Sequence, residues 1–249
     1  MQKVYWEKVS QNYDEEIFDV FANDQRGIIQ SKVVKYSSPG HTVVDIGCAI
    51  GKWLPLLSEN FGFVYAVDIS EQNIVQAKEN HEQLGNIEFM RADLTTKAAE
   101  KIPPCDMALC VNAILTSSFT KRVAFFNSIS NCVKKGGYII LVVPSLESAM
   151  YSEFMLTQWN YQDGKLPGVE NSKDVPKKYS NLKQGVVELD SVPTKHYLEE
   201  ELVINLKNEK FTVTEIEKVQ YPWHTEFVNP PKWMKDPYPW DWMIVARKD

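Results

Sequence analysis

The chain has 249 residues, of which 44% are hydrophobic and 24% are charged, so it has a globular composition and enough length to bury a core. Its 27 basic and 33 acidic residues give a formal net charge of -6 at pH 7, which argues against a general attraction to nucleic acids or anionic membranes. No apolar run reaches the roughly 18 residues of a membrane span, and the four cysteines form no C-x-x-C pair. We therefore expect a cytoplasmic protein with buried free thiols and no metal site.

The first 40 residues are predicted to form two helices. Apolar residues recur at helical spacing over 4–21, and a second helical pattern covers 25–36. The breaker sequence Ser-Ser-Pro-Gly at 37–40 ends the second helix and leads into a short apolar strand at 42–46. A helix at 52–59 follows, in which Pro55 is tolerated because first-turn amides have no intrahelical partner.

Strands and helices then alternate as far as Pro144. The predicted strands are 63–67, 87–90, 106–111 and 138–143. One helix is predicted to start after an N-cap at Ser70 and to stop at Gly85, and another covers 121–133. This alternation predicts right-handed βαβ units and a parallel sheet that is covered by helices on both faces.

The pattern changes between residues 145 and 195. This stretch is polar, is interrupted by glycine and proline, and carries scattered aromatic residues such as Tyr151 and Trp159, so we interpret it as an inserted lid. The chain is then completed by a helix at 196–208, a strand at 211–219, a Pro/Trp-rich loop and a strand at 240–247. We expect one domain over 1–249, with a helical cap at 1–40, a ligand-binding core at 41–144, the lid at 145–195 and closing elements at 196–249.

The sequence Asp-Ile-Gly-Cys-Ala-Ile-Gly at 45–51 predicts a glycine-bracketed loop between a strand and a helix, where backbone amides can approach a small polar ligand. Dinucleotide-binding proteins carry G-x-G-x-x-G at this place, but the corresponding positions here are Gly47, Ala49 and Lys52. Asp45 would repel a pyrophosphate and attract an ammonium group. The loop therefore favours a ligand with a cationic amino-acid end.

In these residues the chain resembles the class I S-adenosylmethionine-dependent methyltransferases. Asp45, Gly47 and Gly51 match the family signature D/E-x-G-x-G-x-G. Ala49 stands in place of the middle glycine, which costs about 1 kcal/mol if the loop needs a left-handed residue there. The sequence K-K-G-G-Y-I-I-L-V-V-P also matches the run into the family's fifth strand, and the resemblance covers about 36–144 and the two closing strands.

The resemblance assigns the family's roles to matching residues. It implies that Asp68 accepts hydrogen bonds from both ribose hydroxyls of the cofactor. It also implies that Asp93 receives the adenine amino group, with Ala92 and Leu94 framing the ring. Taken singly, both acids could instead be ordinary helix-capping residues. The residues that the resemblance assigns to cofactor binding are Asp45, Gly47, Cys48, Ala49, Gly51, Asp68, Ile69, Ala92, Asp93, Leu94, Val111, Asn112 and Tyr13.

A fold and a reaction are also implied by the resemblance. The implied fold is α/β, with a Rossmann-like, seven-stranded, mostly parallel sheet, helices on both faces, an antiparallel last strand and a lid inserted between strands five and six. The implied cofactor is S-adenosylmethionine, which becomes S-adenosylhomocysteine by in-line methyl transfer. The alternatives are a non-catalytic S-adenosylmethionine-binding or protein-interaction domain, a protein methyltransferase, and an NAD-dependent dehydrogenase, which the failed glycine positions disfavour.

A general base would assist the reaction if the methyl acceptor must lose a proton. His196 and His224 are candidates in the substrate-side elements, although a single histidine is more often a structural residue. Tyr13 is a third candidate, in the sequence W-E-K-V-S-Q-N-Y-D. A similar helix in relatives closes over the cofactor, but Tyr13 could equally belong to the buried stripe of its helix.

The acceptor is expected to be a small molecule. The fourth strand reads C-V-N-A-I-L-T and lacks the N-P-P-Y or D-P-P-Y pattern of relatives that methylate amino groups of nucleobases or glutamine. Together with the negative net charge, this predicts no nucleic-acid partner. The aromatic residues of the insertion and of the Pro/Trp-rich loop favour an enclosed pocket, but they are equally compatible with a protein-contact surface or a homodimer.

Overall fold

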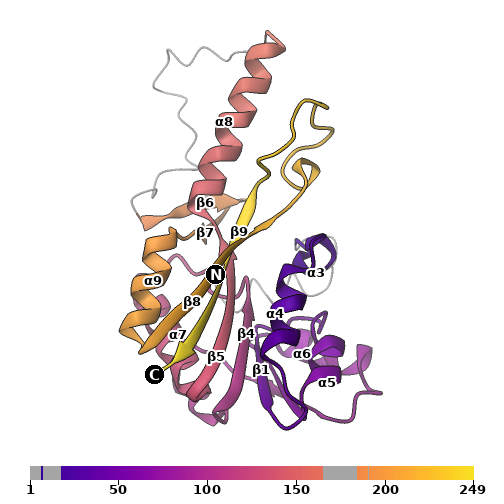
Figure 1. Ribbon diagram of the computed structural model, residues 1–249, viewed down its shortest axis with the longest axis vertical. Coiled ribbons are helices and arrows are strands. Elements are labelled where there is room, and N and C mark those ends of the chain that lie inside the picture. The colour runs from indigo at the N-terminus through magenta and orange to yellow at the C-terminus, as the bar shows by residue number, and fades with distance from the viewer. Residues whose placement is uncertain (1–6, 8–17, 165–183, 190) are drawn as a thin grey trace.

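The centre of the fold is a seven-stranded sheet in the computed structural model, which describes residues 7, 18–164, 184–189 and 191–249. The strands of this sheet are β1 (Thr42–Ile46), β2 (Phe63–Asp68), β3 (Ile87–Arg91), β4 (Cys105–Val111), β5 (Val133–Pro144), β8 (Phe211–Gln220) and β9 (Trp240–Lys248). Their order is β3-β2-β1-β4-β5-β9-β8 (Figure 1). β1 to β5 are parallel, whereas β9 is antiparallel to both β5 and β8. The predicted mostly parallel sheet with an antiparallel last strand is confirmed.

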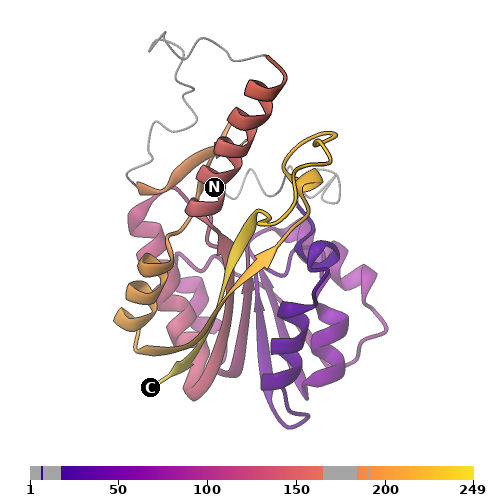
Figure 2. The same cartoon turned by 45° about the horizontal axis from the view of Figure 1, so that its top comes forward.

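Helices cover both faces of this sheet (Figures 1 and 2). They are α3 (Val20–Asn23), α4 (Ile28–Tyr36), α5 (Leu54–Asn60), α6 (Glu71–Asn80), α7 (Phe119–Cys132) and α9 (Glu199–Asn208), with the 3-10 helix η2 (Lys97–Lys101). Phe126 of α7 and Leu202 of α9 belong to one buried apolar cluster, and Val33 of α4 and Leu57 of α5 belong to the other. The parallel strands are therefore buried from two sides, which explains their continuous apolar runs.

The amino-terminal end of α6 agrees with the sequence prediction, whereas its carboxyl-terminal end does not. The Ser70 hydroxyl accepts a hydrogen bond from the Asn73 amide at 3.2 Å, so Ser70 is the N-cap of α6 as predicted. The helix ends at Asn80, well before the expected stop at Gly85. The reason is a turn at residues 81–84, in which the Leu84 amide donates to the His81 carbonyl at 3.0 Å.

The insertion between β5 and β8 contains more regular structure than the sequence predicted. It holds the 17-residue helix α8 (Leu146–Gln162) and a two-stranded hairpin of β6 (Val186–Leu189) and β7 (Val192–Lys195). α8 extends beyond the end of the sheet (Figure 2). The residues that α8 buries are Leu146, Ser148 and Ser152, so it lacks the apolar stripe by which an amphipathic helix is predicted.

Two sets of contacts attach the insertion to the carboxyl end of the sheet. β7 lies against the segment that follows β4, where the Lys195 amide donates to the Leu115 carbonyl at 3.0 Å. α8 is attached to β9 through the Ser148 hydroxyl, which accepts from the Trp240 amide at 2.7 Å. Further out, Trp159 of α8 contacts Phe227 of the β8–β9 loop, with ring centroids 6.1 Å apart. The insertion and the β8–β9 loop therefore both extend beyond the same end of the sheet (Figure 1).

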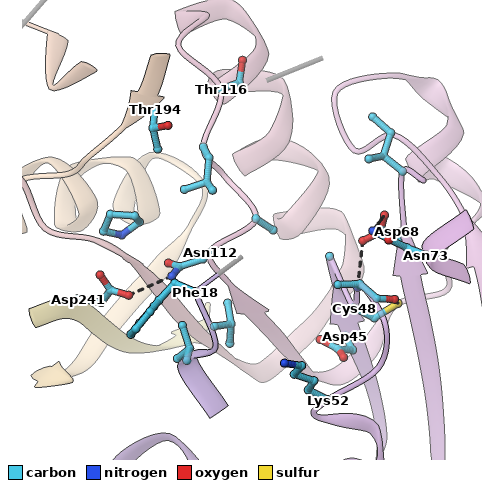
Figure 3. Close-up of a pocket in the computed structure, with 18 of the residues that line it drawn as sticks. Phe18, Asp45, Cys48, Lys52, Asp68, Asn73, Asn112, Thr116, Thr194 and Asp241 are labelled. Carbon is cyan, nitrogen blue, oxygen red and sulfur yellow. Dashed lines mark hydrogen bonds between the residues drawn. The ribbon is translucent and has the colours of Figure 1, made fainter. Parts of the chain in front are cut away.

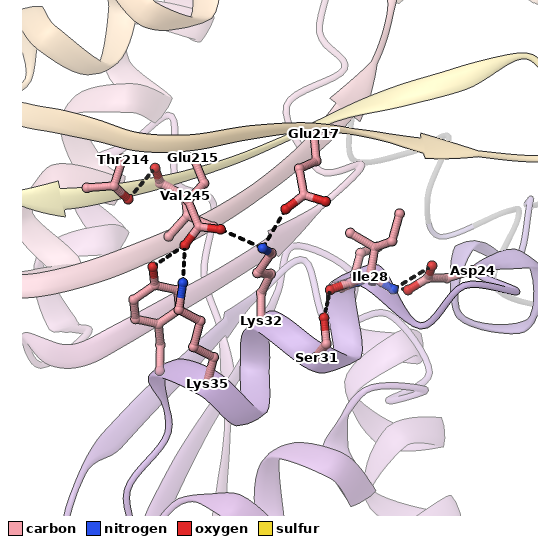
Figure 4. Close-up of polar contacts among 11 residues, drawn as sticks. Asp24, Ile28, Ser31, Lys32, Lys35, Thr214, Glu215, Glu217 and Val245 are labelled. Atoms are coloured by element: carbon pink, nitrogen blue, oxygen red, sulfur yellow. Dashed lines mark hydrogen bonds and ion pairs between the residues drawn. The ribbon is translucent and has the colours of Figure 1, made fainter.

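The outer strand β8 is held to α4 by a group of ion pairs (Figure 4). Lys32 and Lys35 each contact a different oxygen of the Glu215 carboxylate at 2.5 Å, and the Tyr36 hydroxyl also donates to it. Lys32 additionally reaches Glu217 at 2.5 Å. These contacts lower the pKa of Glu215 to about 2, chiefly through the hydrogen bonds from Lys32, Lys35 and Tyr36. The network ties the amino-terminal helices to the antiparallel end of the sheet.

The four cysteines are free and buried, as the sequence predicted. Within the described part of the chain, the helices are all too short or too polar to cross a membrane.

Candidate active site

The loop after β1 is shaped by two glycines with positive φ. Gly47 has φ 76°, and a Cβ atom there would lie 2.6 Å from the Cβ of Ala113. Gly51 has φ 91°, and a Cβ atom there would lie 2.7 Å from the ring of His81. The Gly47 and Cys48 amides both donate to the Val67 carbonyl, at 2.8 and 3.0 Å, which fixes the loop against β2. These glycines are therefore required by backbone conformation and by close packing.

Ala49 also adopts a left-handed conformation, with φ 48°. A side chain in this region of φ costs roughly 1–2 kcal/mol relative to glycine. The Ala49 amide donates to Oδ2 of Asp68 at 3.0 Å, so the strained residue joins the loop to the end of β2 (Figure 3). The departure from the family's glycine is thus accommodated in the loop at an energetic cost.

Asp68, at the end of β2, accepts hydrogen bonds with both carboxylate oxygens. Oδ1 accepts from the Ser70 amide at 2.8 Å and from the Asn73 side chain at 3.3 Å, while Oδ2 accepts from the Ala49 amide. Burial raises the pKa of Asp68, and these hydrogen bonds oppose the rise. Each carboxylate oxygen can accept about two hydrogen bonds, so Oδ2 has capacity for one more donor.

Asp45, in β1, is buried with an unsatisfied carboxylate. Its side chain is 2% exposed, and Oδ2 has no hydrogen-bond partner in the structure. Burial, and secondarily the nearby charge of Asp68, raises the pKa of Asp45 to about 7. A buried acceptor without a donor destabilises the folded protein by about 1–3 kcal/mol. A ligand that brings a hydrogen-bond donor or a cation to Asp45 would remove this penalty.

Asp93, after β3, caps the turn that follows it. Its Oδ1 accepts from the amide and the hydroxyl of Thr95, at 2.8 and 2.7 Å. Oδ2 accepts no hydrogen bond from the described residues. Ala92 and Leu94, on either side, are both buried. The capping role considered for Asp93 is therefore present, and it leaves one oxygen available.

Asp45, Asp68 and Asp93 line one cavity of about 640 Å³ at the carboxyl ends of the parallel strands. Figure 3 shows Asp45 and Asp68 in this cavity. The volume is within the usual range for small-molecule sites, about 300–1,000 Å³. The other residues assigned to the cofactor that also line it are Gly47, Cys48, Ala49, Ile69, Ala92, Leu94, Val111 and Asn112. Gly51 shapes the loop without lining the cavity, and Tyr13 lies outside the described residues.

The two histidine candidates are placed differently. His196, after β7, is buried and lines the cavity, with Nδ1 3.2 Å from the Thr194 carbonyl oxygen. His224 lies in the 3-10 helix η5 (Trp223–Thr225), where it is exposed and does not line the cavity. Of the pair, His196 is the one that reaches the cavity.

The aromatic residues that line the cavity differ from those of the insertion that the sequence suggested. Tyr151 and Trp159 of α8 contact the β8–β9 loop instead, because both sit on the side of α8 that faces Trp223 and Phe227. The aromatic residues that do line the cavity are Phe18, Phe21, Trp53, Phe125, Tyr221 and Trp240. The insertion contributes Leu189, Val192 and Thr194.

A second polar group of residues lies at the other end of the cavity (Figure 3). Asn112, which has φ 48°, donates through Nδ2 to Oδ2 of Asp241 at 3.0 Å. The Tyr221 hydroxyl donates to the same oxygen at 3.0 Å. Burial raises the pKa of Asp241 to about 6, with the two hydrogen bonds opposing the rise. Sequence reasoning found Asn112 but missed Asp241 and Tyr221, which follow it by more than 100 residues and belong to no local motif.

The unsatisfied polar atoms of the described residues concentrate at this cavity. Five buried side-chain atoms have no hydrogen-bond partner. Four of them belong to residues that line the cavity, namely Asp45, Asn73, Asn112 and Trp240. Since buried polar groups are nearly always paired in folded proteins, this concentration indicates a site that is completed by a ligand. Within the described residues, no group of three His, Cys, Asp or Glu side chains could hold a metal ion.

Comparison with known proteins gives a family-model match for the core of the sheet. A family model described as a methyltransferase domain matches residues 43–137. Those residues contain β1 without Thr42, the loop that follows β1, the strands β2 to β4, and the three acids Asp45, Asp68 and Asp93. A search of curated proteins gave no match.

Solved structures share the fold at low sequence identity. An S-adenosylmethionine-dependent methyltransferase from Mesorhizobium loti is 16% identical with a TM-score of 0.63, over 92% of this chain and 100% of that chain. The N-methyltransferase NodS from Bradyrhizobium japonicum, in complex with S-adenosylhomocysteine, is 11% identical with a TM-score of 0.62, over 99% and 97%. A methyltransferase from Methanosarcina mazei is 17% identical with a TM-score of 0.60, over 86% and 95%. Residues 43–137 therefore match a methyltransferase domain, and the chain has the fold of the class I S-adenosylmethionine-dependent methyltransferases.

Proposed function

We propose that this protein transfers a methyl group from S-adenosylmethionine to a small-molecule acceptor. The observation that carries the proposal is the row of three acids, Asp45, Asp68 and Asp93, at the ends of three neighbouring strands in one cavity. The unsatisfied oxygen of Asp45 supports it further, because a buried carboxylate of this kind suits the ammonium group of an amino acid.

The available hydrogen-bonding positions fit the parts of this cofactor. Asp45 would hold the ammonium end through Oδ2. Asp68 would accept from the ribose hydroxyls, for which Oδ2 keeps one free position. Asp93 would accept from the adenine amino group through Oδ2, with the buried Ala92 and Leu94 beside the ring. The solved complex of NodS with S-adenosylhomocysteine supports the same cofactor for this fold.

S-adenosylmethionine supplies an activated methyl group on a positively charged sulfur, so the protein's tasks are alignment of the acceptor and exclusion of water. Val111, the last residue of β4, and Asn112, which follows it, line the same cavity. Pro144, Thr194 and His196 line it from the direction of β5 and the insertion. These residues would enclose an acceptor on the far side of the methyl group.

A small acceptor is supported by the size and the charge of the site. A cavity of about 640 Å³ that must also contain a cofactor leaves room for a compact second ligand. The net charge of -6 is unfavourable for nucleic acid.

The four free cysteines suit the reducing cytoplasm that we propose as the location.

The cofactor assignment is tested by Asp68→Ala. We expect the variant to bind S-adenosylmethionine more than tenfold more weakly, because the ribose loses a charged hydrogen-bond acceptor. Isothermal titration calorimetry measures the change, with Glu88→Ala, which removes an exposed acid of β3, as the matched control. Equal affinity of Asp68→Ala and the unmodified protein, with both folded by circular dichroism, would remove Asp68 from the site. Binding of NAD in place of S-adenosylmethionine would reject the proposal as a whole.

Transfer itself is tested with S-adenosylmethionine that carries a tritiated methyl group. Incubation with a fractionated metabolite extract should place tritium in a small organic product. Label that appears only in protein or nucleic acid would overturn the small-molecule assignment, and binding without any transfer would indicate a non-catalytic cofactor-binding domain.

A further inference from the structure

Asp241 is a buried acid with no cationic hydrogen-bond partner among the described residues. Its side chain is 8% exposed and lines the cavity. Its hydrogen-bond donors among the described residues, Asn112 and Tyr221, are both neutral, and both bond to Oδ2. Oδ1 therefore has no donor in this part of the structure. A buried carboxylate is normally paired with a cation, so Asp241 presents an unmet negative charge to the cavity.

The lysines that line the cavity do not supply the missing charge. Lys52 contacts Asp19 at 2.6 Å, and Lys121 belongs to the first turn of α7. Neither forms an ion pair or a hydrogen bond with Asp241. Lys218 lies over the face of Trp240 at 3.7 Å from the ring centroid, where its charge is directed at the ring. Among the described residues, no lysine or arginine forms a hydrogen bond or an ion pair with Asp241, so a ligand can supply a positive charge there.

A second unmet acceptor lies beside Asp241. Asn112 donates to Asp241 through Nδ2, and its own Oδ1 is buried without a partner. Two acceptors, Oδ1 of Asp241 and Oδ1 of Asn112, thus belong to residues joined by a 3.0 Å hydrogen bond. A hydroxyl group has one hydrogen to donate and would leave one of them unsatisfied, whereas a protonated amine has three. The donor count therefore favours an amine over an alcohol.

The walls at this end are aromatic. Phe18 and Tyr221 meet edge to face with ring centroids 4.8 Å apart, and Trp240 directly precedes Asp241 in β9. All three line the cavity. Aromatic faces attract cations and also accommodate an apolar body, so they suit an amine that carries a compact hydrophobic group.

We infer that the methyl acceptor is a small primary amine, bound as its ammonium ion by Asp241 and Asn112. This inference rests on the proposed methyl transfer and names the substrate class. Oδ1 of Asp241 accepts one proton from the ammonium, which exposes the nitrogen lone pair. The nitrogen then bonds to the methyl carbon as the carbon–sulfur bond breaks, and the electron pair of that bond goes to sulfur. The products are a methylated ammonium ion and a neutral thioether, and the proton on Asp241 is released to solvent.

The test compares two ligands that share a carbon frame, 2-phenylethylamine and 2-phenylethanol. The full chain is first saturated with S-adenosylhomocysteine, which fills the end of the cavity that contains Asp45, and each probe is then titrated by calorimetry. We expect the dissociation constant of the amine to be at least tenfold lower than that of the alcohol. Asp241→Asn should reduce this difference to less than threefold and leave the affinity for S-adenosylhomocysteine within twofold. Glu226→Gln, which makes the same change at another cavity-lining acid, should retain it.

An amine that binds no better than the alcohol, including the absence of binding by both, overturns the inference. A preference that persists in Asp241→Asn also overturns it. The comparison on the unmodified protein needs no variant, so it decides the question even if Asp241→Asn does not fold. Failure of S-adenosylhomocysteine to bind is a separate result, which rejects the proposed function before either probe is added.

Discussion

Ala49 has a backbone conformation that glycine adopts more easily, which makes it a site of measurable strain. With φ 48°, its side chain costs roughly 1–2 kcal/mol relative to glycine. A glycine makes the unfolded chain more flexible, which costs about 0.4–1 kcal/mol, so we expect Ala49→Gly to raise the free energy of unfolding by up to about 1 kcal/mol. Urea denaturation followed by circular dichroism measures this change.

The control for this substitution is Ala77→Gly in the middle of α6, where helical φ makes glycine unfavourable. That variant should lose about 1 kcal/mol. A loss of stability in Ala49→Gly as well would show that the loop conformation is not strained.

Asp45 makes the stability of the ligand-free protein depend on pH. Because its pKa is raised to about 7, the folded state retains a proton that the unfolded state releases near pH 4. The folded state therefore binds more protons between these values, and its stability falls as the pH rises from about 4 to about 7. Asp45→Asn removes this penalty, so its free energy of unfolding relative to the unmodified protein should increase on going from pH 4.5 to pH 7.5.

One unit of pKa shift corresponds to about 1.4 kcal/mol, so the expected relative gain is on the order of a few kcal/mol. Denaturant titrations at the two pH values, without cofactor, measure it, with Glu88→Gln as a control for the loss of a carboxylate. The same relative stability at both pH values would show that Asp45 is not held in a protonated state by burial.

At the scale of elements, Glu215 joins β8 to α4, and its effect on stability has the opposite pH dependence. Its pKa is lowered to about 2, so its contribution is fully present above about pH 4.5 and is lost as the pH falls toward 2. We expect Glu215→Gln to lower the free energy of unfolding by about 1 kcal/mol at pH 7, because three donors lose a charged acceptor that is only partly exposed. The difference from the unmodified protein should vanish near pH 2.

Glu217→Gln is the matched control for that prediction, since Glu217 contacts Lys32 alone and is more exposed. It should have a smaller effect in the same denaturation experiment. Equal effects of the two substitutions would contradict a special role for Glu215.

The elements that the sequence predicted well are those with local physical signals. Ser70 caps α6 because its hydroxyl serves an amide three residues away, and this relation is visible in the sequence. α8 was missed because its neighbours are distant in the chain. Its Ser148 hydroxyl accepts from the Trp240 amide, 92 residues away, and its aromatic residues contact the β8–β9 loop. A helix that is stabilised in this way carries no regular apolar stripe.

At the scale of the whole molecule, the two ends of the cavity differ in how far they could be predicted. Asp45 and Asp68 lie at the ends of β1 and β2, and Asp93 follows β3, so their shared edge could be deduced from spacing and resemblance. Asp241 and Asn112 are 129 residues apart in the sequence and form a hydrogen bond. They meet because β9, which carries Asp241, lies between β5 and β8 in the sheet. That partnership depends on tertiary packing, and the sequence has no local pattern that reports it.

The position of β9 between β5 and β8 also has a consequence for how the protein is made. β9 is the last of the seven strands to leave the ribosome, yet it pairs with both β5 and β8. Until it arrives, the apolar β5 presents an unpaired edge, which is a hazard for aggregation. Asp241 is the second residue of β9, so a nascent chain gains this carboxylate in the same step that closes the sheet. A chain that stalls before this step lacks Asp241 and also exposes the edge of β5, a surface that chaperones can bind.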